Sequence, residues 1–310
     1  MSHIYIYSPS GAVRDRAAFR RGVQRLRALG HEVEIDPAAL ASWQRFAGDD
    51  ATRLAAIGRA AASGADMALI TRGGYGLTRL LPALPYQALA RAARRGTRLV
   101  GFSDFTALQL ALLAKAGGVS WAGPALLEGF GAPDPQQPDE ITLACFQDLA
   151  NGSAEGAGWR LPASDVRALA ARRGTHLARD ATLWGGNLSM VLSLLGTPWW
   201  PRVAGGVLFL EDVGEPPYRI ERMLAQLLHS GVLARQQAIV LGAFTGYTLT
   251  AHERGYSMAK VVDWLRAQIK TPVLTGLPLG HVPTKVLLPV GAKVDLLIEG
   301  REALVLWGHI

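Results

Sequence analysis

The order of apolar segments in the first 125 residues constrains the fold more than any other feature of this sequence. Short apolar runs alternate there with segments in which apolar side chains recur at helical spacing. Such alternation is typical of parallel strands joined by helices, so we expect an α/β layer. The expected strands are residues 4–7, 32–35, 67–71 and 99–102, and the expected helices are residues 17–29, 52–62, 87–95 and 105–116.

The second half of the chain has a different pattern, because several of its expected strands near the C-terminus have no helix between them. This favours a mixed sheet. The glycine-rich run NGSAEGAG at residues 151–158 is typical of a linker. We expect a first domain at residues 1–150, a linker at 151–164 and a C-terminal domain at 165–310. Strands are expected at residues 166–171, 206–210, 238–243, 286–288, 294–298 and 303–306, and helices at 141–150, 188–195, 220–229 and 258–269.

Composition excludes several classes of protein. With 49% hydrophobic and 18% charged residues, the chain is not intrinsically disordered. The single cysteine, Cys145, excludes an intramolecular disulfide framework and a cysteine-rich zinc site. The N-terminus lacks the features of a signal peptide, and no uncharged apolar run approaches the roughly 18 residues of a membrane span. We therefore expect a soluble, cytoplasmic protein that does not bind a membrane.

The formal net charge of +7 raises the question of an acidic partner. The basic residues are spread through the expected helices without a stripe of neighbouring aromatic residues or a nucleic-acid-binding motif. We therefore expect no nucleic-acid partner. A small anionic substrate and a solvated, arginine-rich surface fit the charge equally well.

The run GFSDFT at residues 101–106 connects an expected strand to an expected helix through a tight turn. This connection places the Ser103 hydroxyl at a sharp corner and resembles a nucleophile elbow, although the spacing is not G-x-S-x-G. The alternative is that Ser103 or Asp104 caps the following helix.

The run RGGYG at residues 72–76 follows another expected strand. Its three glycines allow backbone N–H groups to point at one anion, as in an oxyanion hole or a phosphate nest. The alternative is a tight connection without a ligand. The spacing matches neither a dinucleotide fingerprint nor a P-loop.

A serine nucleophile needs a base, and the base needs an acid that orients it. Among the seven histidines, His281 stands out because it lies between prolines and a glycine in the run LPLGHVP. An apolar run ends in Glu211 and Asp212, and Glu215 lies close by. Any of the three carboxylates fits the role of the acid. We see no spacing of metal ligands and no sign of a cofactor.

Five motifs in this order resemble the LD-carboxypeptidases, the muramoyltetrapeptide carboxypeptidase family of serine peptidases. They are RGGYG (72–76), GFSDFT (101–106), WGGNL (184–188), LFLEDVGEPPYRIERML (208–224) and Gly280-His281. Each motif alone is weak, but the five in this order are specific. The resemblance covers essentially the whole chain, from the run SPSG at residues 8–11 to the C-terminal strands.

The resemblance implies a catalytic triad of Ser103, Glu211 and His281. It also implies a flavodoxin-like N-terminal domain, a smaller β-rich C-terminal domain and a site between them. A member of this family is expected to be a cytoplasmic homodimer that removes the terminal D-alanine from murein tetrapeptides during cell-wall recycling.

Further roles follow from this chemistry. The N–H groups of Gly74 and Asp104 are expected to receive the oxyanion. Arg72, Asn187 and Arg219 are candidates for holding the terminal carboxylate of the substrate. Trp184 is expected either to pack on the substrate or to lie in an interface.

Two other functions remain open from the sequence. A related self-immunity peptidase that cleaves peptidyl-nucleotide antibiotics would share the triad and differ in its pocket. A binding module would use the glycine-rich loop to hold an anion without any chemistry.

Overall fold

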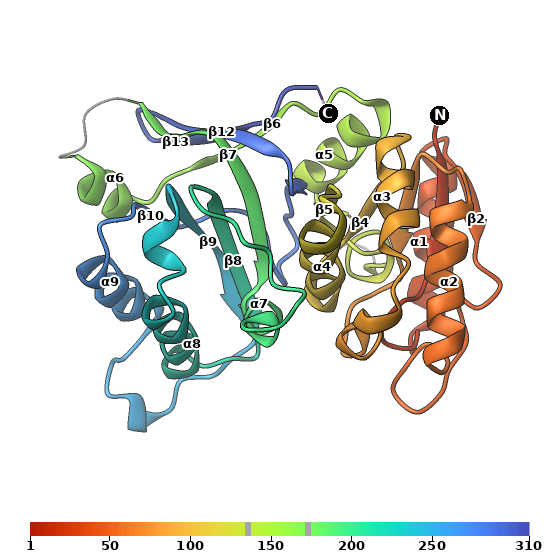
Figure 1. The fold of residues 1–310 in the computed structure, drawn as a ribbon, viewed down its shortest axis with the longest axis horizontal. Helices are drawn as coiled ribbons and strands as arrows, with labels where there is room; N and C mark the ends of the chain where they lie inside the picture. The colour runs from red at the N-terminus through yellow and green to blue at the C-terminus, as the bar shows by residue number, and fades with distance from the viewer. Residues whose placement is uncertain (134–137, 171–174, 310) are drawn as a thin grey trace.

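The computed structural model describes residues 1–133, 138–170 and 175–309. Two β-sheets lie side by side in it, and α4 (Thr106–Ala116) and α7 (Leu188–Leu194) lie between them (Figure 1). Helix α4 packs against α7 and against β7 (His176–Asn187) of the second sheet. Residues 106–112 of this helix are buried, whereas Ala114 and Lys115 near its end are exposed.

The first sheet is parallel except at one edge. Its strands follow the order β2-β1-β3-β4-β5, which is the flavodoxin-like order. Strand β11 (Leu288–Val290) comes from the C-terminal half of the chain and pairs antiparallel with β5. The parallel strands are β1 (His3–Tyr7), β2 (Glu32–Ile35), β3 (Met67–Ile70), β4 (Arg98–Gly101) and β5 (Ser120–Ala122). The other helices of this half are α1 (Arg16–Ala28), α2 (Asp50–Ala62), α3 (Tyr86–Arg94) and α5 (Glu140–Asn151).

The second sheet is mixed, as the sequence predicts, and has the order β10-β9-β8-β7-β12-β13-β6. The first four strands in this order are parallel, and β12, β13 and β6 continue the sheet in antiparallel pairs. Besides β7, its strands are β6 (Gly156–Arg160), β8 (Val207–Val213), β9 (Ala238–Thr245), β10 (Val273–Leu274), β12 (Lys293–Glu299) and β13 (Glu302–Leu306). The remaining helices are α6 (Ala163–Leu169), α8 (Pro217–His229) and α9 (Met258–Gln268).

The structure departs from the predicted elements in several places. The short strands β5 and β10 were not predicted. The strand expected at residues 166–171 is wrong, since residues 163–169 form α6; Val166 and Leu169 are three apart, which is helical spacing. The expected linker at residues 151–164 contains β6. Strand β7 has no counterpart among the predicted strands, because His176, Arg179 and Asp180 interrupt any apolar run.

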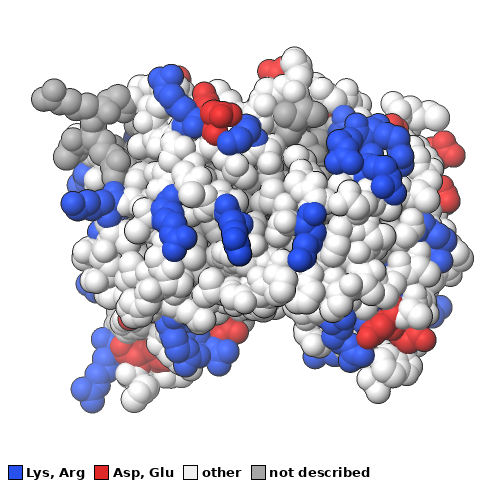
Figure 2. Space-filling view, viewed as in Figure 1, with Lys and Arg blue, Asp and Glu red and all other residues white. Residues whose placement is uncertain are grey.

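Within the described ranges, every helix is too short or too polar to cross a bilayer. On the face shown in Figure 2, most Lys and Arg side chains stand apart from one another. A denser basic group lies at the upper right of that view, in the region of α3, whose last turn carries Arg91 and Arg94.

A buried aspartate on α6 forms an ion pair with α9 and a hydrogen bond to the residue after the edge strand β10. Asp165 is fully buried and accepts hydrogen bonds from Arg266 at 2.7 Å and from the N–H of Thr275 at 2.6 Å. Breaking a buried pair leaves one charge without its partner. We predict that Asp165→Ala lowers the free energy of unfolding by about 3 kcal/mol, measured by urea denaturation.

The matched control is Asp263→Ala on α9, since Asp263 is an exposed aspartate. This variant should unfold within about 0.5 kcal/mol of the unmodified protein. Equal stabilities of the two variants would contradict the role assigned to Asp165.

Candidate active site

Ser103 lies in a sharp turn directly after β4. Its backbone has a φ of +63°, a left-handed conformation that is uncommon for residues other than glycine. The following 3-10 turn, Ser103–Phe105, leads into α4. Among the residues that the structure describes, none forms a hydrogen bond with the half-buried Ser103 hydroxyl. This geometry is that of a strained corner whose hydroxyl makes no hydrogen bond to the described residues.

The structure does not support the capping alternative: among the described residues, no side chain caps the 3-10 turn or α4. The Asp104 carboxylate turns away from the helix. It accepts hydrogen bonds from the Ser10 hydroxyl at 2.8 Å and from the Leu77 N–H at 2.9 Å. Burial raises the pKa of Asp104 to about 6, although these donors lower it.

The glycine-rich loop after β3 lies directly against the Ser103 turn. A Cβ at position 73 would stand 2.8 Å from the Cβ of Ser103 and 2.9 Å from its Oγ, so a side chain does not fit there. Gly74 has a φ of +99°, which favours glycine. Two strand ends of the first sheet thus bring the loop and the serine into contact.

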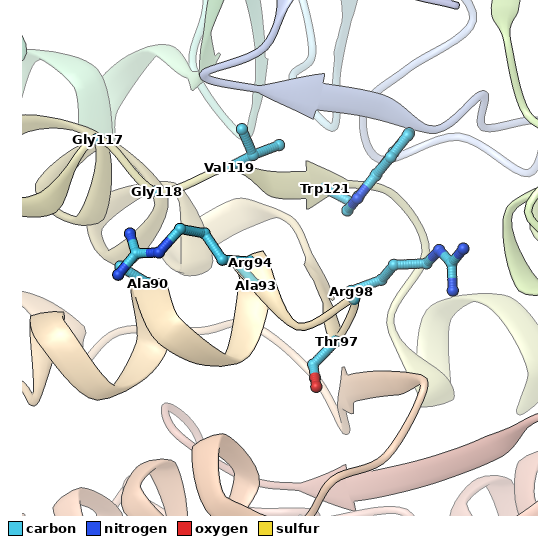
Figure 3. Close-up of a pocket in the computed structure, with 10 residues that line it drawn as sticks. Ala90, Ala93, Arg94, Thr97, Arg98, Gly117, Gly118, Val119 and Trp121 are labelled. Carbon is cyan, nitrogen blue, oxygen red and sulfur yellow. The ribbon is translucent and has the colours of Figure 1, made fainter. Parts of the chain in front are cut away.

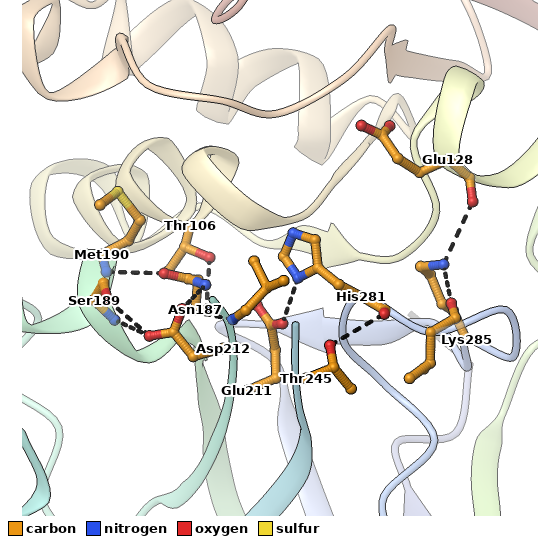
Figure 4. A network of polar contacts seen from close by, with 12 residues as sticks. Thr106, Glu128, Asn187, Ser189, Met190, Glu211, Asp212, Thr245, His281 and Lys285 are labelled. Atoms are coloured by element: carbon orange, nitrogen blue, oxygen red, sulfur yellow. Dashed lines mark hydrogen bonds and ion pairs between the residues drawn. The ribbon is translucent and has the colours of Figure 1, made fainter. Parts of the chain in front are cut away.

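The second sheet contributes a carboxylate and an imidazole. Glu211 lies near the end of β8 with its side chain 3% exposed, and its Oε2 is 3.0 Å from Nδ1 of His281 (Figure 4). A buried carboxylate bonded to Nδ1 favours the tautomer in which Nδ1 carries the proton. The other ring nitrogen, Nε2, is then free to act as a base.

The loop that carries His281 packs tightly on the ends of β8 and β9. The N–H of Ala243 donates to the carbonyl of Leu279 at 2.9 Å. Gly280 has a φ of +135°, and a Cβ there would lie 3.2 Å from Oε2 of Glu211. The ring of His281 lies 4.9 Å, between centroids, from the ring of Phe102, the residue before Ser103. The imidazole is thereby held beside the turn that contains the serine.

The other two carboxylates near Glu211 have separate partners. Asp212 accepts hydrogen bonds from the side-chain amide of Asn187 at 2.9 Å and from the Ser189 N–H at 2.9 Å, at the beginning of α7 (Figure 4). Glu215 forms an ion pair with Arg219 one helical turn away. Of the three candidate acids, Glu211 is the one that contacts His281.

A cavity of about 510 Å³ opens beside His281 and Phe102. Lys285 and Glu128 also line it, and neither was predicted from the sequence. Lys285 is buried, donates to the carbonyl of Val282, and has a pKa lowered by that burial. Burial raises the pKa of Glu128, whose carboxylate lies 3.8 Å from the guanidinium of Arg72. In the sequence, only the position of Lys285, four residues after His281, could have indicated that it lines this cavity.

Another cavity, of about 310 Å³, lies at the opposite end of the first sheet (Figure 3). It is lined by Arg94, Arg98 and Trp121, and by glycines that precede β4 and β5. Ligands on open α/β sheets bind beyond the carboxyl ends of the strands, whereas this cavity is at their amino ends. We therefore do not assign the active site to it.

The four candidate substrate-binding residues occupy different surroundings. Trp184 is fully buried, and its indole N–H donates to Gln236 at 3.0 Å. The Asn187 side chain is occupied by Asp212 and by capping α7. Arg219 is paired with Glu215. Arg72, one-third exposed, lies beside the glycine-rich loop and the cavity.

Known proteins share both the sequence pattern and the fold. Residues 4–123 match the family model of the LD-carboxypeptidase N-terminal domain, and residues 180–296 match that of the C-terminal domain. The murein tetrapeptide carboxypeptidase of Pseudomonas aeruginosa is 35% identical over 74% of this chain and 71% of its own length. The microcin C7 self-immunity protein of Escherichia coli is 28% identical over 75% of this chain and 71% of its own length.

A solved structure agrees over nearly the full length. The muramoyltetrapeptide carboxypeptidase from Oxalobacter formigenes is 36% identical, with a TM-score of 0.83, over 98% of this chain and 97% of its own. Two family models that together cover most of the chain, and relatives of this similarity, establish the assignment. The chain belongs to the LD-carboxypeptidase family of serine peptidases.

Proposed function

We propose that this protein is a serine carboxypeptidase that releases the terminal D-alanine from the L,D-linked murein tetrapeptide in cell-wall recycling. The observation that carries the proposal is the contact of the buried Glu211 carboxylate with the partly exposed His281 imidazole beside the strained Ser103 turn. The names of the Pseudomonas and Oxalobacter relatives support the choice of substrate. On the family's pattern, we also propose a cytoplasmic homodimer.

In the proposed mechanism, the Ser103 hydroxyl attacks the carbonyl that is linked to D-alanine while Nε2 of His281 takes the hydroxyl proton. His281 then gives that proton to the leaving amine, and an acyl-enzyme remains on Ser103. Glu211 holds Nδ1–H in place and stabilises the imidazolium. Water, activated by the same imidazole, hydrolyses the ester. The Ser103–His281 hydrogen bond forms when the substrate is bound, since such bonds are often long in free enzymes.

The oxyanion of each tetrahedral intermediate would lie between the N–H groups of Gly74 and Asp104. Gly73 holds the loop against Ser103, so both donors lie within one short region around the nucleophile. One such donor is typically worth about 3 kcal/mol to the transition state.

We assign the terminal carboxylate of the substrate to Arg72. Asn187 and Arg219 are occupied by Asp212 and Glu215, whereas Arg72 lies near the cavity and has a distant contact, at 3.8 Å, with Glu128. Lys285 adds a second positive charge to the same cavity. We do not assign Trp184 to the substrate, because its side chain is fully buried.

The similarity to the microcin C7 self-immunity protein supports a second candidate, a peptidase acting on aminoacyl-nucleotide antibiotics. Incubation of the purified protein with each substrate separates the two. Release of D-alanine from the tetrapeptide supports the carboxypeptidase, whereas turnover of the aminoacyl nucleotide alone supports the second candidate.

The first prediction about catalysis concerns the nucleophile and the base. Ser103→Ala and His281→Ala should each lower kcat for D-alanine release by at least about 10³-fold, because each removes a member of one catalytic unit. Mass spectrometry of the tetrapeptide digest measures the product.

Ser153→Ala provides a control, since it removes an exposed hydroxyl after α5. It should retain full activity and stability. Undiminished activity of Ser103→Ala would rule out the proposed mechanism and favour a binding module.

The second prediction concerns the close contact at Gly73. Gly73→Ala should lower kcat by about 100-fold. The added Cβ would push the glycine-rich loop and Ser103 apart, and this displacement would misplace the reacting groups. Steady-state kinetics on the tetrapeptide checks this expectation. Gly58→Ala in α2 is the control, since its added Cβ would meet no described residue within 4 Å beyond its own helix backbone and its chain neighbours. If both variants kept full activity, the close approach at Gly73 would have no catalytic importance.

A further inference from the structure

Three segments of the first sheet meet around Ser103: residues 8–11 after β1, residues 71–77 after β3, and residues 102–105 after β4. Two buried residues of opposite charge join them. Asp104 accepts from Ser10 of the first segment and from Leu77 of the second. Arg53, on α2, donates to the carbonyls of Pro9 at 3.3 Å and Gly76 at 2.9 Å.

Asp104 and Arg53 therefore hold neighbouring residues of the same two segments. Asp104 accepts hydrogen bonds from them, and Arg53 donates hydrogen bonds to their backbone carbonyls. Both side chains are almost fully buried, at 2% exposure for Asp104 and 0% for Arg53. A Cβ at Gly76 would stand 2.5 Å from the guanidinium of Arg53, so the loop passes directly over that group. The contacts fix the position of the glycine-rich loop on both sides.

Burial of the Asp104 carboxylate is energetically unfavourable for a contact that is only structural. Within the described part of the chain, no Lys or Arg forms an ion pair with it, and its Oδ1 has no hydrogen-bond partner. Burial raises the pKa of this carboxyl, which means that the site disfavours the charged form. A buried polar group retained at such a cost is typical of a functional site.

The position of Asp104 in the chain lets its carboxylate link the nucleophile turn to the glycine-rich loop. The same residue follows the nucleophile, and its side chain reaches across to the loop that touches Ser103 through Gly73. Any shift of the loop relative to Ser103 would have to stretch the Asp104–Leu77 bond.

We propose that the Asp104 side chain is a positioning residue, which fixes the glycine-rich loop and the segment at Ser10 against the nucleophile turn so that the oxyanion donors surround the position of attack. This role is separate from that of the Asp104 N–H. It rests on the proposed function in one respect, namely that Ser103 is the nucleophile.

The test uses the rate at which a fluorophosphonate labels Ser103, which requires the nucleophile and the oxyanion donors but not the peptide. Asp104→Ala should slow labelling by about 100-fold, as expected for displaced reacting groups. Its kcat on the tetrapeptide should fall in parallel, with KM within about threefold of the unmodified protein.

Asp104→Asn distinguishes positioning by hydrogen bonds from a need for charge. Both hydrogen bonds end on Oδ2, so a carboxamide oxygen in that place can accept both. We expect this variant to label within about fivefold of the unmodified rate. Labelling as slow as in Asp104→Ala would overturn the proposal.

Two further variants keep the test decisive. Asp36→Ala removes another buried aspartate of the same domain, one that bonds to Tyr5 and Arg59, and should label at the unmodified rate. Ser10→Ala deletes one of the two donors to Asp104; it should slow labelling by roughly fivefold even if Asp104→Ala does not fold. Unmodified rates in folded Asp104→Ala or in Ser10→Ala would overturn the proposal. An unmodified protein that does not label at Ser103 would instead refute the proposed function.

Discussion

A carboxylate buried at the end of β8 needs a hydrogen-bond donor, and the imidazole of His281 supplies it at 3.0 Å. This requirement accounts for the position of the loop at residues 277–283. It approaches β8 and β9 so closely that Gly242 and Gly280 have no room for a side chain without displacing backbone or Glu211. With the imidazole fixed there, its ring lies 4.9 Å from the ring of Phe102, the residue before Ser103.

The two sheets contribute different parts of the proposed chemistry. The first sheet holds the nucleophile and the oxyanion donors on the carboxyl ends of adjacent parallel strands, where ligands bind in such folds. The second holds the acid and the base. Strand β11, which lies just after the His281 loop, pairs with β5 and thereby ties that loop to the first sheet. The relative position of the two halves therefore depends on local pairing as well as on side-chain packing.

The sequence was sufficient to predict elements whose signal is local. Apolar periodicity predicted the strands β1 to β4 of the first sheet and its helices, but not the three-residue strand β5. Five short motifs predicted the family. It failed where partners are distant in the chain: β11 in the first sheet, β7 with its polar residues, and the choice among Glu211, Asp212 and Glu215 from spacing alone. Likewise, burial of Trp184 and the reach of the Asp104 side chain to Ser10 depend on tertiary packing, which no local pattern records.

The central claim is that Glu211 orients His281 for attack by Ser103, and the most direct test is the kcat of Glu211→Gln for D-alanine release. The amide keeps the size of the side chain but favours the wrong imidazole tautomer, so we predict a fall of about 10⁴-fold. Glu215→Gln, in the same segment, should retain full activity. Full activity in Glu211→Gln, or its loss in Glu215→Gln alone, would contradict the account.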